Sequence, residues 1–535
     1  MNVNKIIKES WRYAIFNIEK KYYCFDCYTF KFFSISDELA GLIKRKKFYD
    51  IKSMYPKFYK EVVLKRELSS KVTLPKKEKQ CKVTINLSNN CNLNCIYCYR
   101  NKTEKTSLSE KQIEEIFQYL KYDYMPNADC YILSFCNTSE SSLDLEKLKF
   151  VDKMIAKYEG NYFSEKNIAK KQLLRLYNRL PEEIQKRHPL GNVFSTLNNI
   201  LETEKLWKIY DYSNNDYLKS VITENDLSLS RRVMANRSIL NNLCADLKLE
   251  RPIKYISFWF MTNGTNITDE YIHFIKSIFM KEVTVSIDGN EEIHNFSRKY
   301  KNGKGSFADT INGIRKLQEN GIAVKASITI TPAYPKFIDI IDYLNSIGIS
   351  KFTFNLVRGT KENCFFDEKA ISILINSWKK IYQLVYDEIR LKEFHYLKLL
   401  KGCYAFSIIN RLYFRKYMTE RCGWNNELVI DSKGRMYHCN STIGIENDYL
   451  GNYIDKKSIK KIKRTEKNVD NDERCKKCNL KYLCGGTCYA NDLFQNTNGR
   501  DQECFYKREI IKEGLILYAK LYKNGLLKDF LRAIN

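Results

Sequence analysis

The chain has 535 residues, of which 90 are Lys or Arg, 63 are Asp or Glu and 5 are His, so its formal net charge is +27. With 44% hydrophobic and 13% aromatic residues it can bury a large core, which excludes an intrinsically disordered chain. No run of about 18 apolar residues occurs, so we expect no membrane span. Because the Lys excess is spread along the chain without a compact basic tract, we expect no nucleic-acid partner either.

The 18 Cys residues are the most informative part of the composition. The N-terminal residues lack the apolar core of a signal peptide, so we expect the protein in the cytoplasm. A reducing compartment does not favour disulfides, and clustered Cys residues there indicate metal binding or catalysis. With so few His residues, all-Cys sites are favoured over mixed Cys/His zinc sites.

The first 80 residues form a segment of their own, which we expect to be a small α+β module. Aromatic and polar residues alternate over Trp11–Phe16 and Tyr22–Phe33, which predicts a hairpin. Two helices are expected to follow, at about Asp37–Lys46 and Asp50–Lys65.

After this module, strand and helix patterns alternate, which predicts an α/β fold with parallel strands in a sheet or barrel. The predicted helices are Ser109–Lys121, Leu143–Tyr158, Phe307–Asn320 and Phe337–Ser346. The predicted strands are Lys82–Ser88, Tyr131–Cys136, Tyr255–Met261, Val283–Ile287, Ala323–Thr331 and Lys351–Asn355.

The predicted domain organisation follows from these patterns. The barrel takes residues 81–158 and 252–358, interrupted by a helical insertion over 159–251. A helical connector over 359–420 leads to a Cys-rich domain over 421–510 and a C-terminal helix over 511–535.

Three Cys residues follow directly on the first predicted barrel strand, in the pattern Cys91-x3-Cys95-x2-Cys98. A [4Fe–4S] cube normally takes four Cys ligands, so three ligands leave one iron open to a further molecule. By spacing alone, a zinc ion with a distant fourth ligand is the alternative.

The residues around this pattern carry a resemblance to a known family. NLSNNCNLNCIYCYR resembles the Cys-x3-Cys-x-aromatic-Cys signature of radical S-adenosylmethionine (SAM) enzymes, with Tyr97 in the aromatic position. MTNGTNITDE, which contains Asn263, looks like their third-strand segment. VTVSIDGNEEIHNFSRKYKNGKGSF resembles their fourth-strand segment, where the matching positions are Ser286, Asp288 and Arg298.

This resemblance implies a partial (β/α)6 TIM-like barrel and a SAM site. In the family, the open iron binds the amino and carboxylate groups of SAM, and one electron cleaves the sulfonium to give a 5′-deoxyadenosyl radical that takes a hydrogen atom from substrate. The SAM contacts implied here are Tyr97, Asn263, Ser286, Asp288 and Arg298. The sequence names no catalytic acid or base.

One motif departs from the family pattern. Where relatives have Gly-Gly-Glu-Pro after the second strand, this chain has Thr138-Ser139-Glu140-Ser141. Glu140 is the surviving candidate SAM contact, and the alternative is a solvated loop Glu. Because Gly lets the backbone approach a ligand closely, the side chains at 138 and 139 leave open a SAM-impaired homologue that acts as a scaffold.

The second Cys-rich region has the pattern Cys422-x11-Gly434-x4-Cys439, then Cys-x2-Cys-x5-Cys-x3-Cys, then one further Cys. It resembles the SPASM extension of radical SAM peptide-modifying enzymes, which implies two auxiliary [4Fe–4S] clusters and three clusters in all. Carried over by position, the first auxiliary set is Cys422, Cys439 and Cys488, and the second is Cys475, Cys478, Cys484 and Cys504.

Several alternatives remain open at this point. The missing fourth ligand of the first auxiliary set is Cys403, or that iron is open; otherwise Cys403 is a small buried hydrophobe. A zinc ribbon over Cys475–Cys488 is the alternative to the second set. The lone pair Cys24 and Cys27 and the remaining Cys residues are expected to be structural. For His294, packing or a loop hydrogen bond is favoured over acid–base catalysis.

The resemblance implies a maturase that modifies a ribosomally made precursor peptide, with a thioether crosslink from Cys sulfur to carbon as the favoured product. Formylglycine formation, as in sulfatase maturases, and a non-enzymatic metal-cluster or scaffold protein are the alternatives. The implied partners are a precursor peptide with a leader and an external electron donor such as flavodoxin or ferredoxin. The 1–80 module resembles in layout the leader-binding modules of such enzymes, which bind peptides by strand addition.

Overall fold

The structure is a computed structural model. It describes residues 10–64, 80–98, 104–124, 130–136, 138–165, 255–278, 280, 282–358, 364–400, 402–419, 427–455, 468–494 and 497–534. Most of the predicted 159–251 insertion lies outside these residues. Among the helices of the described part, none is both long and apolar enough to cross a membrane.

The N-terminal module begins with a three-stranded antiparallel sheet in the order β1-β2-β3. Its strands are β1 (Tyr13–Ile18), β2 (Lys21–Asp26) and β3 (Lys31–Ile35). The predicted hairpin was therefore wrong in one respect, because the segment Tyr22–Phe33 holds two strands and a turn. Phe30 adopts a positive φ of 52° in that turn, which the alternating pattern did not indicate.

The helices of this module pack on one face of the sheet. They are α2 (Asp37–Lys44), α3 (Phe48–Met54), α4 (Pro56–Phe58) and a short π-helical turn η2 (Tyr59–Val63). The second predicted helix is broken because Tyr55 precedes Pro56 and takes an extended φ of −131°.

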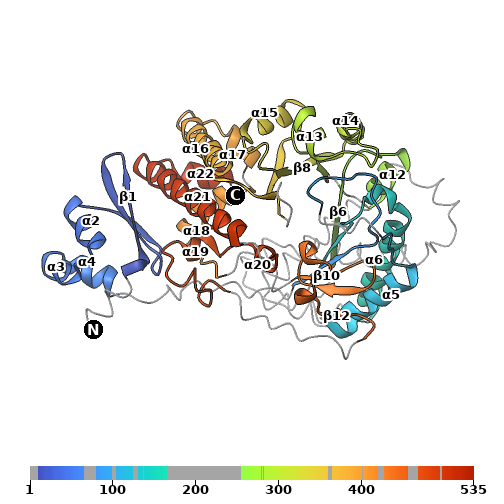
Figure 1. Ribbon diagram of the computed structural model, residues 1–535, viewed down its shortest axis with the longest axis horizontal. Helices are drawn as coiled ribbons and strands as arrows, with labels where there is room; N and C mark the ends of the chain where they lie inside the picture. Colours follow the sequence, from blue (N-terminus) through green and yellow to red (C-terminus); the bar gives the residue numbers. More distant parts are fainter. Residues whose placement is uncertain are drawn as a thin grey trace, which may run out of the picture.

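A nine-stranded sheet forms the larger part of the molecule, in the order β12-β11-β10-β4-β5-β6-β7-β8-β9. Strands β4 to β9 are all parallel to their neighbours. Together they confirm the predicted six-stranded α/β unit (Figure 1). Their bounds are β4 Gln80–Ile85, β5 Cys130–Phe135, β6 Tyr255–Thr262, β7 Glu282–Ser286, β8 Ala323–Ile330 and β9 Lys351–Leu356.

Helices follow the parallel strands, as the alternating pattern predicts. The first, α5 (Glu110–Tyr119), starts at a capping box in which Ser109 and Gln112 bond each other's backbone N–H. The others are α6 (Leu145–Glu165), α12 (Asp269–Ser277), α13 (Glu291–Ser297), α14 (Phe307–Glu319) and α15 (Ile338–Ser346).

The Cys-rich region adds strands to the barrel sheet, which the sequence did not predict. Strand β10 (Glu427–Ile430) pairs in parallel with β4, on the side opposite to β5. Strands β11 (Arg435–Tyr437) and β12 (Gly451–Asn452) follow antiparallel. A segment more than three hundred residues away along the chain therefore lies beside the first barrel strand.

A layer of helices lies between the N-terminal module and the barrel (Figure 1). In it, α16 and α21 contact each other extensively, and α18 packs on α21. The bounds are α16 Glu368–Arg390, α17 His395–Leu400, α18 Tyr404–Tyr413, α19 Lys481–Cys484, α20 Tyr489–Leu493, α21 Thr497–Lys523 and α22 Leu527–Ile534. Helix α21 starts well before the predicted C-terminal helix over 511–535 and contains Cys504.

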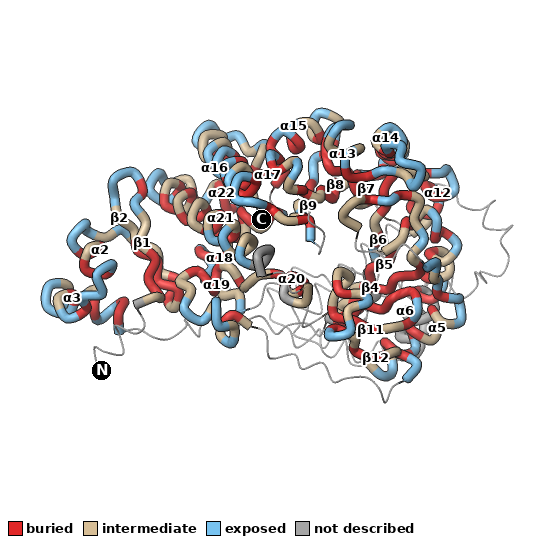
Figure 2. Tube along the Cα trace, viewed as in Figure 1, coloured by how far each residue is buried: buried red, intermediate tan, exposed pale blue. Residues whose placement is uncertain are grey.

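Buried residues follow the barrel strands and the facing sides of the helices (Figure 2). The N-terminal module has a small core of its own around Leu39, Phe48 and Ile51. The opposite face of its sheet, including Phe25 and Phe30, belongs to the main core. The module is thus joined to the rest of the protein by apolar packing.

Candidate active site

The loop that carries the first three Cys residues is held by the segment after α13. Asn94 N donates to Lys299 O at 2.7 Å, and Ile96 N donates to Ser297 O at 3.0 Å. Leu93 and Tyr300 form an isolated antiparallel bridge between the same two segments. The sequence motif around residue 298 therefore fixes the backbone of the Cys loop.

Tyr97, Asp288 and Arg298 form one buried network beside this loop. The Asp288 carboxylate accepts from the Tyr97 hydroxyl at 2.5 Å and from Arg298 Nε at 3.1 Å. Burial alone would lower the pKa of Arg298, but Asp288 raises it above its ordinary value. One Arg298 nitrogen lies 4.0 Å from Cys95 Sγ, so the network places a fixed positive charge next to a predicted ligand. The structure thus brings these three predicted residues together.

Asn263 connects the end of β6 to the Cys loop. Its amide nitrogen donates to Asn92 Oδ1 at 2.8 Å and lies 3.9 Å from Cys91 Sγ. Its backbone N–H donates to the Glu140 carboxylate at 2.6 Å. The ends of β5 and β6 are thereby tied to the first Cys of the motif.

Glu140 is 2% exposed, so it is not the solvated loop residue that the sequence left open. Besides Asn263, its carboxylate accepts from the Thr262 hydroxyl at 2.5 Å and from the backbone N–H and hydroxyl of Ser142. Burial raises the pKa of Glu140, and these hydrogen bonds oppose the rise. The structure shows a carboxylate that orders two strand ends, and its role toward SAM stays a prediction.

The two side chains that replace the family's Gly pair bond to protein atoms. Thr138 Oγ1 donates to Ser88 O at 3.1 Å, and Ser139 Oγ donates to Asp144 at 2.6 Å. Thr138 is thus bonded to the segment after β4, and Ser139 to the residue before α6.

The remaining candidates of this region lie at the end of β7 and on α13. Ser286 is buried as the last residue of β7. His294 is fully buried and its Nε2 lies 3.0 Å from Ser306 Oγ. Ser306 Oγ itself donates to Arg298 O at 2.8 Å, so it accepts from His294. The packing and loop hydrogen-bond role expected for His294 is confirmed.

The second auxiliary set is gathered around α19 and the middle of α21. The groups that raise the pKa of Cys475 are, after burial and Asp472, the thiols of Cys484, Cys478 and Cys504. Cys484 is on α19 and Cys504 is on α21. The set therefore connects the Cys-rich loop to the helical layer. The four residues that the resemblance assigns to one set are therefore neighbours.

The first auxiliary set is described in part, because Cys422 lies outside the described residues. Burial raises the pKa of Cys488, and its further neighbours include Arg358, Glu503 and Cys439. Arg358 is also a neighbour of Cys439 and lowers the pKa of its thiol against burial. Cys439 and Cys488 thus share one environment.

Cys403 is buried at the N-terminus of α18. Burial raises the pKa of Cys403 to about 12, and Lys325 opposes the rise. Neither Cys439 nor Cys488 is among the described groups that act on it. Its buried setting agrees with a small hydrophobe and gives the fourth-ligand alternative no support.

Gly434 shows why the Cys422-x11-Gly434-x4-Cys439 spacing contains a Gly. It adopts φ +77° in the turn between β10 and β11. A Cβ atom there would lie 2.6 Å from the Tyr453 ring. Only Gly fits this left-handed conformation and this close approach.

The other described Cys residues are buried and separate. Cys24 belongs to the core of the N-terminal module, whereas Cys27 faces the main core, so the lone pair does not converge. Cys81, Cys136 and Cys364 are also buried in the main core. The side chain of Cys130 and all of Cys244 lie outside the description.

Each of the three sets contains at least one thiol whose pKa is raised by burial, so that the neutral form is favoured there. Burial raises the pKa of Cys95 to about 11 and that of Cys475 to about 12. Iron would therefore displace protons on binding, as thiolate ligation requires. In the described part of the chain, no three Cys, His, Asp or Glu side chains stand close enough to hold a single metal ion. The donor set of grouped thiols suits iron–sulfur clusters, which use one Cys per iron.

The structure adds residues that sequence reasoning missed. Glu503 and Lys507 form a buried ion pair on α21, and the Glu503 carboxylate accepts from the backbone N–H of Cys488 at 3.0 Å. Asn86 is fully buried at the end of β4 and bonds to Ile430 of β10. No sequence motif marks either feature.

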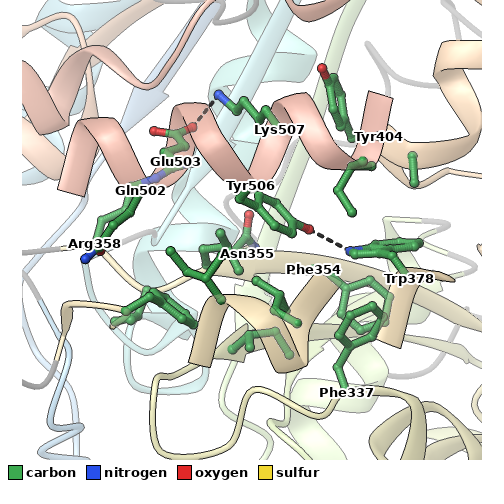
Figure 3. A pocket seen from close by; sticks show the side chains of 18 of the residues that line it. Phe337, Phe354, Asn355, Arg358, Trp378, Tyr404, Gln502, Glu503, Tyr506 and Lys507 are labelled. Carbon is green, nitrogen blue, oxygen red and sulfur yellow. Dashed lines mark hydrogen bonds and ion pairs between the residues drawn. The ribbon is translucent and has the colours of Figure 1, made fainter. Parts of the chain in front are cut away.

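A cavity of about 210 Å³ lies between β9, α18 and α21. Figure 3 shows Arg358, Gln502 and Glu503 at one end and Phe337 and Trp378 at the other. Through Arg358 and Glu503 the cavity adjoins the surroundings of the first auxiliary set.

Comparison with known proteins agrees with this geometry. No family model matches the chain. A serine-type anaerobic sulfatase-maturating enzyme of Bacteroides thetaiotaomicron is 24% identical over 271 residues, which cover 44% of this chain and 62% of that enzyme. The radical SAM cyclopropyl synthase TigE of Paramaledivibacter caminithermalis is 21% identical over 357 residues, which cover 63% of this chain and 69% of that enzyme.

Solved structures share the fold. The structure described as native anSMEcpe with bound AdoMet has a TM-score of 0.52 at 15% identity and covers 83% of this chain and 99% of its own. The same protein with AdoMet and the Cp18Cys peptide has a TM-score of 0.51 at 17% identity, with the same coverage.

In sequence the chain is similar to sulfatase-maturating enzymes and to a radical SAM enzyme, and in fold it is similar to anSMEcpe. Its recorded relatives include sulfatase-maturating enzymes and a cyclopropyl synthase. The match with the first of these relatives spans less than two thirds of that enzyme's length.

Proposed function

We propose that this protein is a radical SAM maturase that modifies a ribosomally made precursor peptide by forming a thioether bond between a Cys sulfur and a carbon atom. The observation that carries the proposal is the junction of the Cys91–Cys98 loop with the ends of β5, β6 and β7. Buried polar residues of all three strand ends meet the loop there. Relatives of the chain include radical SAM enzymes.

In this proposal Cys91, Cys95 and Cys98 hold a [4Fe–4S] cluster with one open iron for SAM. When bound, the cluster and SAM would supply a radical that removes a hydrogen atom from a peptide carbon, and the carbon–sulfur bond would then form with loss of the thiol proton and of one electron, which an auxiliary cluster would accept. Tyr97 and Arg298 would lie beside the bound cluster, and Asp288 holds both side chains in place. Glu140 orders Asn263, whose amide lies next to Cys91.

The SPASM region is proposed to hold two auxiliary clusters. Cys422, Cys439 and Cys488 would hold the first, with one iron open, and Cys475, Cys478, Cys484 and Cys504 would hold the second. An external flavodoxin or ferredoxin would supply electrons. Because the grouped thiols need a reducing compartment, we place the enzyme in the cytoplasm.

The N-terminal module is proposed to bind the leader of the precursor peptide. Strand β3 pairs with β2 on one side, and in the described residues no strand pairs with its other edge. An extended peptide can add to such an edge through backbone hydrogen bonds.

The test is anaerobic cleavage of SAM by the reconstituted full chain with a chemical reductant. We expect 5′-deoxyadenosine from the wild type and none from the Cys91/Cys95/Cys98→Ala variant. Equal amounts from both proteins would contradict the proposal. An inactive wild type with intact clusters would instead support the scaffold alternative, and restoring Gly at 138 and 139 would then test the cause.

A second candidate function is formylglycine formation on a sulfatase. It is favoured by relatives named as serine-type and cysteine-type anaerobic sulfatase-maturating enzymes. A hydrazide probe for aldehydes separates the two functions, because formylglycine carries an aldehyde and a thioether does not. Incubation with a sulfatase peptide that yields an aldehyde would favour this second candidate.

A further inference from the structure

The cavity between β9, α18 and α21 has apolar walls and one polar end. Phe337, Phe354 and Trp378 line its apolar part. Trp378 Nε1 donates to the Tyr506 hydroxyl at 2.6 Å, so both polar atoms have a partner and the rings present apolar surface (Figure 3). Such a lining fits an apolar or aromatic ligand group.

The size of the cavity limits its occupant. Its volume is about 210 Å³. Pockets for drug-sized ligands hold roughly 300–1,000 Å³. The cavity is therefore too small for a nucleoside cofactor such as SAM and suits one large side chain.

The polar end of the cavity lies near Cys439 and Cys488 of the first auxiliary set. Arg358 at the polar end is an electrostatic neighbour of both Cys439 and Cys488. Glu503, at the same end, accepts a hydrogen bond from the backbone N–H of Cys488. A side chain in the cavity would thus hold the adjoining peptide backbone beside these Cys residues.

We propose that this cavity is a subsite for one bulky apolar side chain, preferably aromatic, of the substrate peptide. It rests on the proposed function, because it assumes a peptide substrate that meets the first auxiliary site. The occupant is a side chain of an extended peptide, because the cavity is apolar inside and carries Arg358, Gln502 and Glu503 where a polar backbone would enter.

Gly402 offers a position from which a substitution can narrow the cavity. It lines the cavity, and a Cβ atom built on it meets no other atom within 4 Å. Gly402 is exposed, so Gly402→Leu should place a side chain at the edge of the cavity without a backbone clash, and Gly402→Ala is the matched control. The probe is N-acetyl-4-fluorophenylalanine amide, followed by fluorine NMR on the reconstituted holoenzyme, with N-acetylalanine amide as the competitor.

We expect the fluorinated probe to bind the wild type and Gly402→Ala within about twofold of each other, and to bind Gly402→Leu at least about fivefold more weakly. An excess of the alanine amide should not displace it. Absence of binding to the wild type, or equal binding to Gly402→Leu, would overturn the proposal. SAM cleavage measured in the same samples reports separately on the proposed function.

A different observation carries a second inference, which concerns the ion pair between Glu503 and Lys507 on α21. The Glu503 side chain is 10% exposed and the Lys507 side chain 2%. Lys507 Nζ also donates to Gly486 O at 2.9 Å. Lys507 and Glu503 therefore bond to Gly486 and Cys488, and so they attach the loop between Cys484 and Cys488 to α21, the helix that carries Cys504.

Stability alone does not account for such a pair. Removing two charges from water costs several kcal/mol per ion, and apolar replacements of buried pairs are often neutral or stabilising. An Ala or Leu pair at the same helical spacing would pack α21 at lower cost. The charges stand instead between residues of both auxiliary sets.

We infer that Glu503 and Lys507 are positioning residues that set the reduction potentials of the two auxiliary clusters in addition to fixing the Gly486–Cys488 loop. Potentials of iron–sulfur clusters depend on nearby charge and on hydrogen bonds at the ligands. This inference rests on the proposed cluster ligands, and it concerns the potentials rather than the substrate.

The test is a redox titration of the reconstituted protein followed by electron paramagnetic resonance. Removing the positive charge in Lys507→Met should lower the auxiliary potentials, and removing the negative charge in Glu503→Gln should raise them. The double variant should return toward the wild type, and Lys507→Arg should stay close to it. Lys476→Met removes an exposed Lys next to Cys475 and should shift little, because water and salt screen that charge.

Shifts of the same sign in both single variants, or no shift at unchanged iron content, would overturn the inference. Iron per chain is measured for every variant. If Lys507→Met does not fold, the sign of the Glu503→Gln shift and the Lys507→Arg rescue still decide it.

Discussion

Buried polar side chains define the candidate SAM site at the scale of single residues. Asp288 is 1% exposed and bonds to a tyrosine, an arginine and the backbone N–H of Thr329. A carboxylate with these three hydrogen bonds holds its partners in one geometry in the absence of a ligand. His294 lies next to this network, because the backbone N–H of Arg298 donates to His294 O at 2.8 Å.

His294 leads to a prediction about pH. Burial, with a smaller effect from Arg298, lowers the pKa of His294 to about 3, and its Nδ1 has no hydrogen-bond partner among the described residues. Below about pH 6.5, His294 is protonated in the unfolded chain but stays neutral in the folded protein. Stability is therefore lost as the pH falls from about 6.5 toward 3, by roughly 1.4 kcal/mol per pH unit at most.

The substitution His294→Gln should remove this contribution while keeping a hydrogen bond to Ser306. Urea unfolding at several pH values checks it. The stability difference between wild type and variant should shrink or reverse as the pH drops from 7 to 5. A difference that is independent of pH would contradict the assignment.

At this scale, the sequence motifs singled out Tyr97, Asp288 and Arg298, which the structure brings together beside the Cys loop, and their role toward SAM stays a prediction. Asp288 and Arg298 are ten positions apart, yet the structure joins them. Glu503 and Lys507 escaped notice because Glu and Lys four residues apart on a helix usually form an exposed pair. Only the packing around α21 shows that the pair is buried.

At the scale of elements, Arg12 organises the N-terminal module. Its guanidinium bonds both oxygens of Asp26 at 2.9 Å and also donates to Val62 O at 2.7 Å. Arg12 and Asp26 are both almost fully buried. One side chain thus ties the sheet to the last helical turn of the module.

Arg12→Ala should destabilise the module by about 3–5 kcal/mol, because it leaves Asp26 buried without its partner. Limited proteolysis and urea unfolding of the full chain measure the effect. Lys52→Ala on the exposed face of α3 is the control and should change stability by less than about 0.5 kcal/mol. A loss below about 1 kcal/mol for Arg12→Ala would contradict the account.

Asn86 connects the barrel to the Cys-rich region. Its side chain donates to Ile430 O at 3.3 Å and to Asn440 Oδ1 at 3.0 Å, and accepts from Thr138 N at 3.0 Å. These partners come from three separate segments. Asn after a strand is typical of a turn, so the sequence did not indicate this role.

Asn86→Leu should cost about 1–3 kcal/mol, because the buried partners of the amide lose their hydrogen bonds. Hydrogen exchange followed by mass spectrometry should show faster exchange in β10 and in the loop after β5. Asn17→Ala, at an exposed site on β1, is the control. Unchanged exchange in β10 would show that Asn86 does not hold the two regions together.

Strand and helix periodicity predicted the six parallel strands, because each is rich in apolar, aromatic or β-branched residues and is bounded by polar loops. Two features of the elements did not follow from it. The short β10 has four residues, and its pairing with β4 spans the whole barrel sequence. The extra strand of the N-terminal sheet was hidden because aromatic residues continue through the turn at Phe30.

At the scale of the whole molecule, the N-terminal module contacts the segment that carries the second auxiliary set. Asn479, next to Cys478, donates to Tyr13 O at 3.2 Å. The ring centroids of Phe30 and Tyr417 lie 4.2 Å apart. A module proposed to bind a leader thus touches the region proposed to hold a cluster. This arrangement follows from packing between distant segments, which spacing and composition do not encode.

The central claim is that the chain holds three iron–sulfur clusters, one of them on Cys91, Cys95 and Cys98. The most direct measurement is iron, sulfide and zinc per chain after anaerobic reconstitution, beside the Cys91/Cys95/Cys98→Ala variant. Three [4Fe–4S] clusters predict about twelve irons per chain, falling by about four in the variant. About two zinc ions with almost no iron would contradict the account and leave a metal-binding protein without radical chemistry.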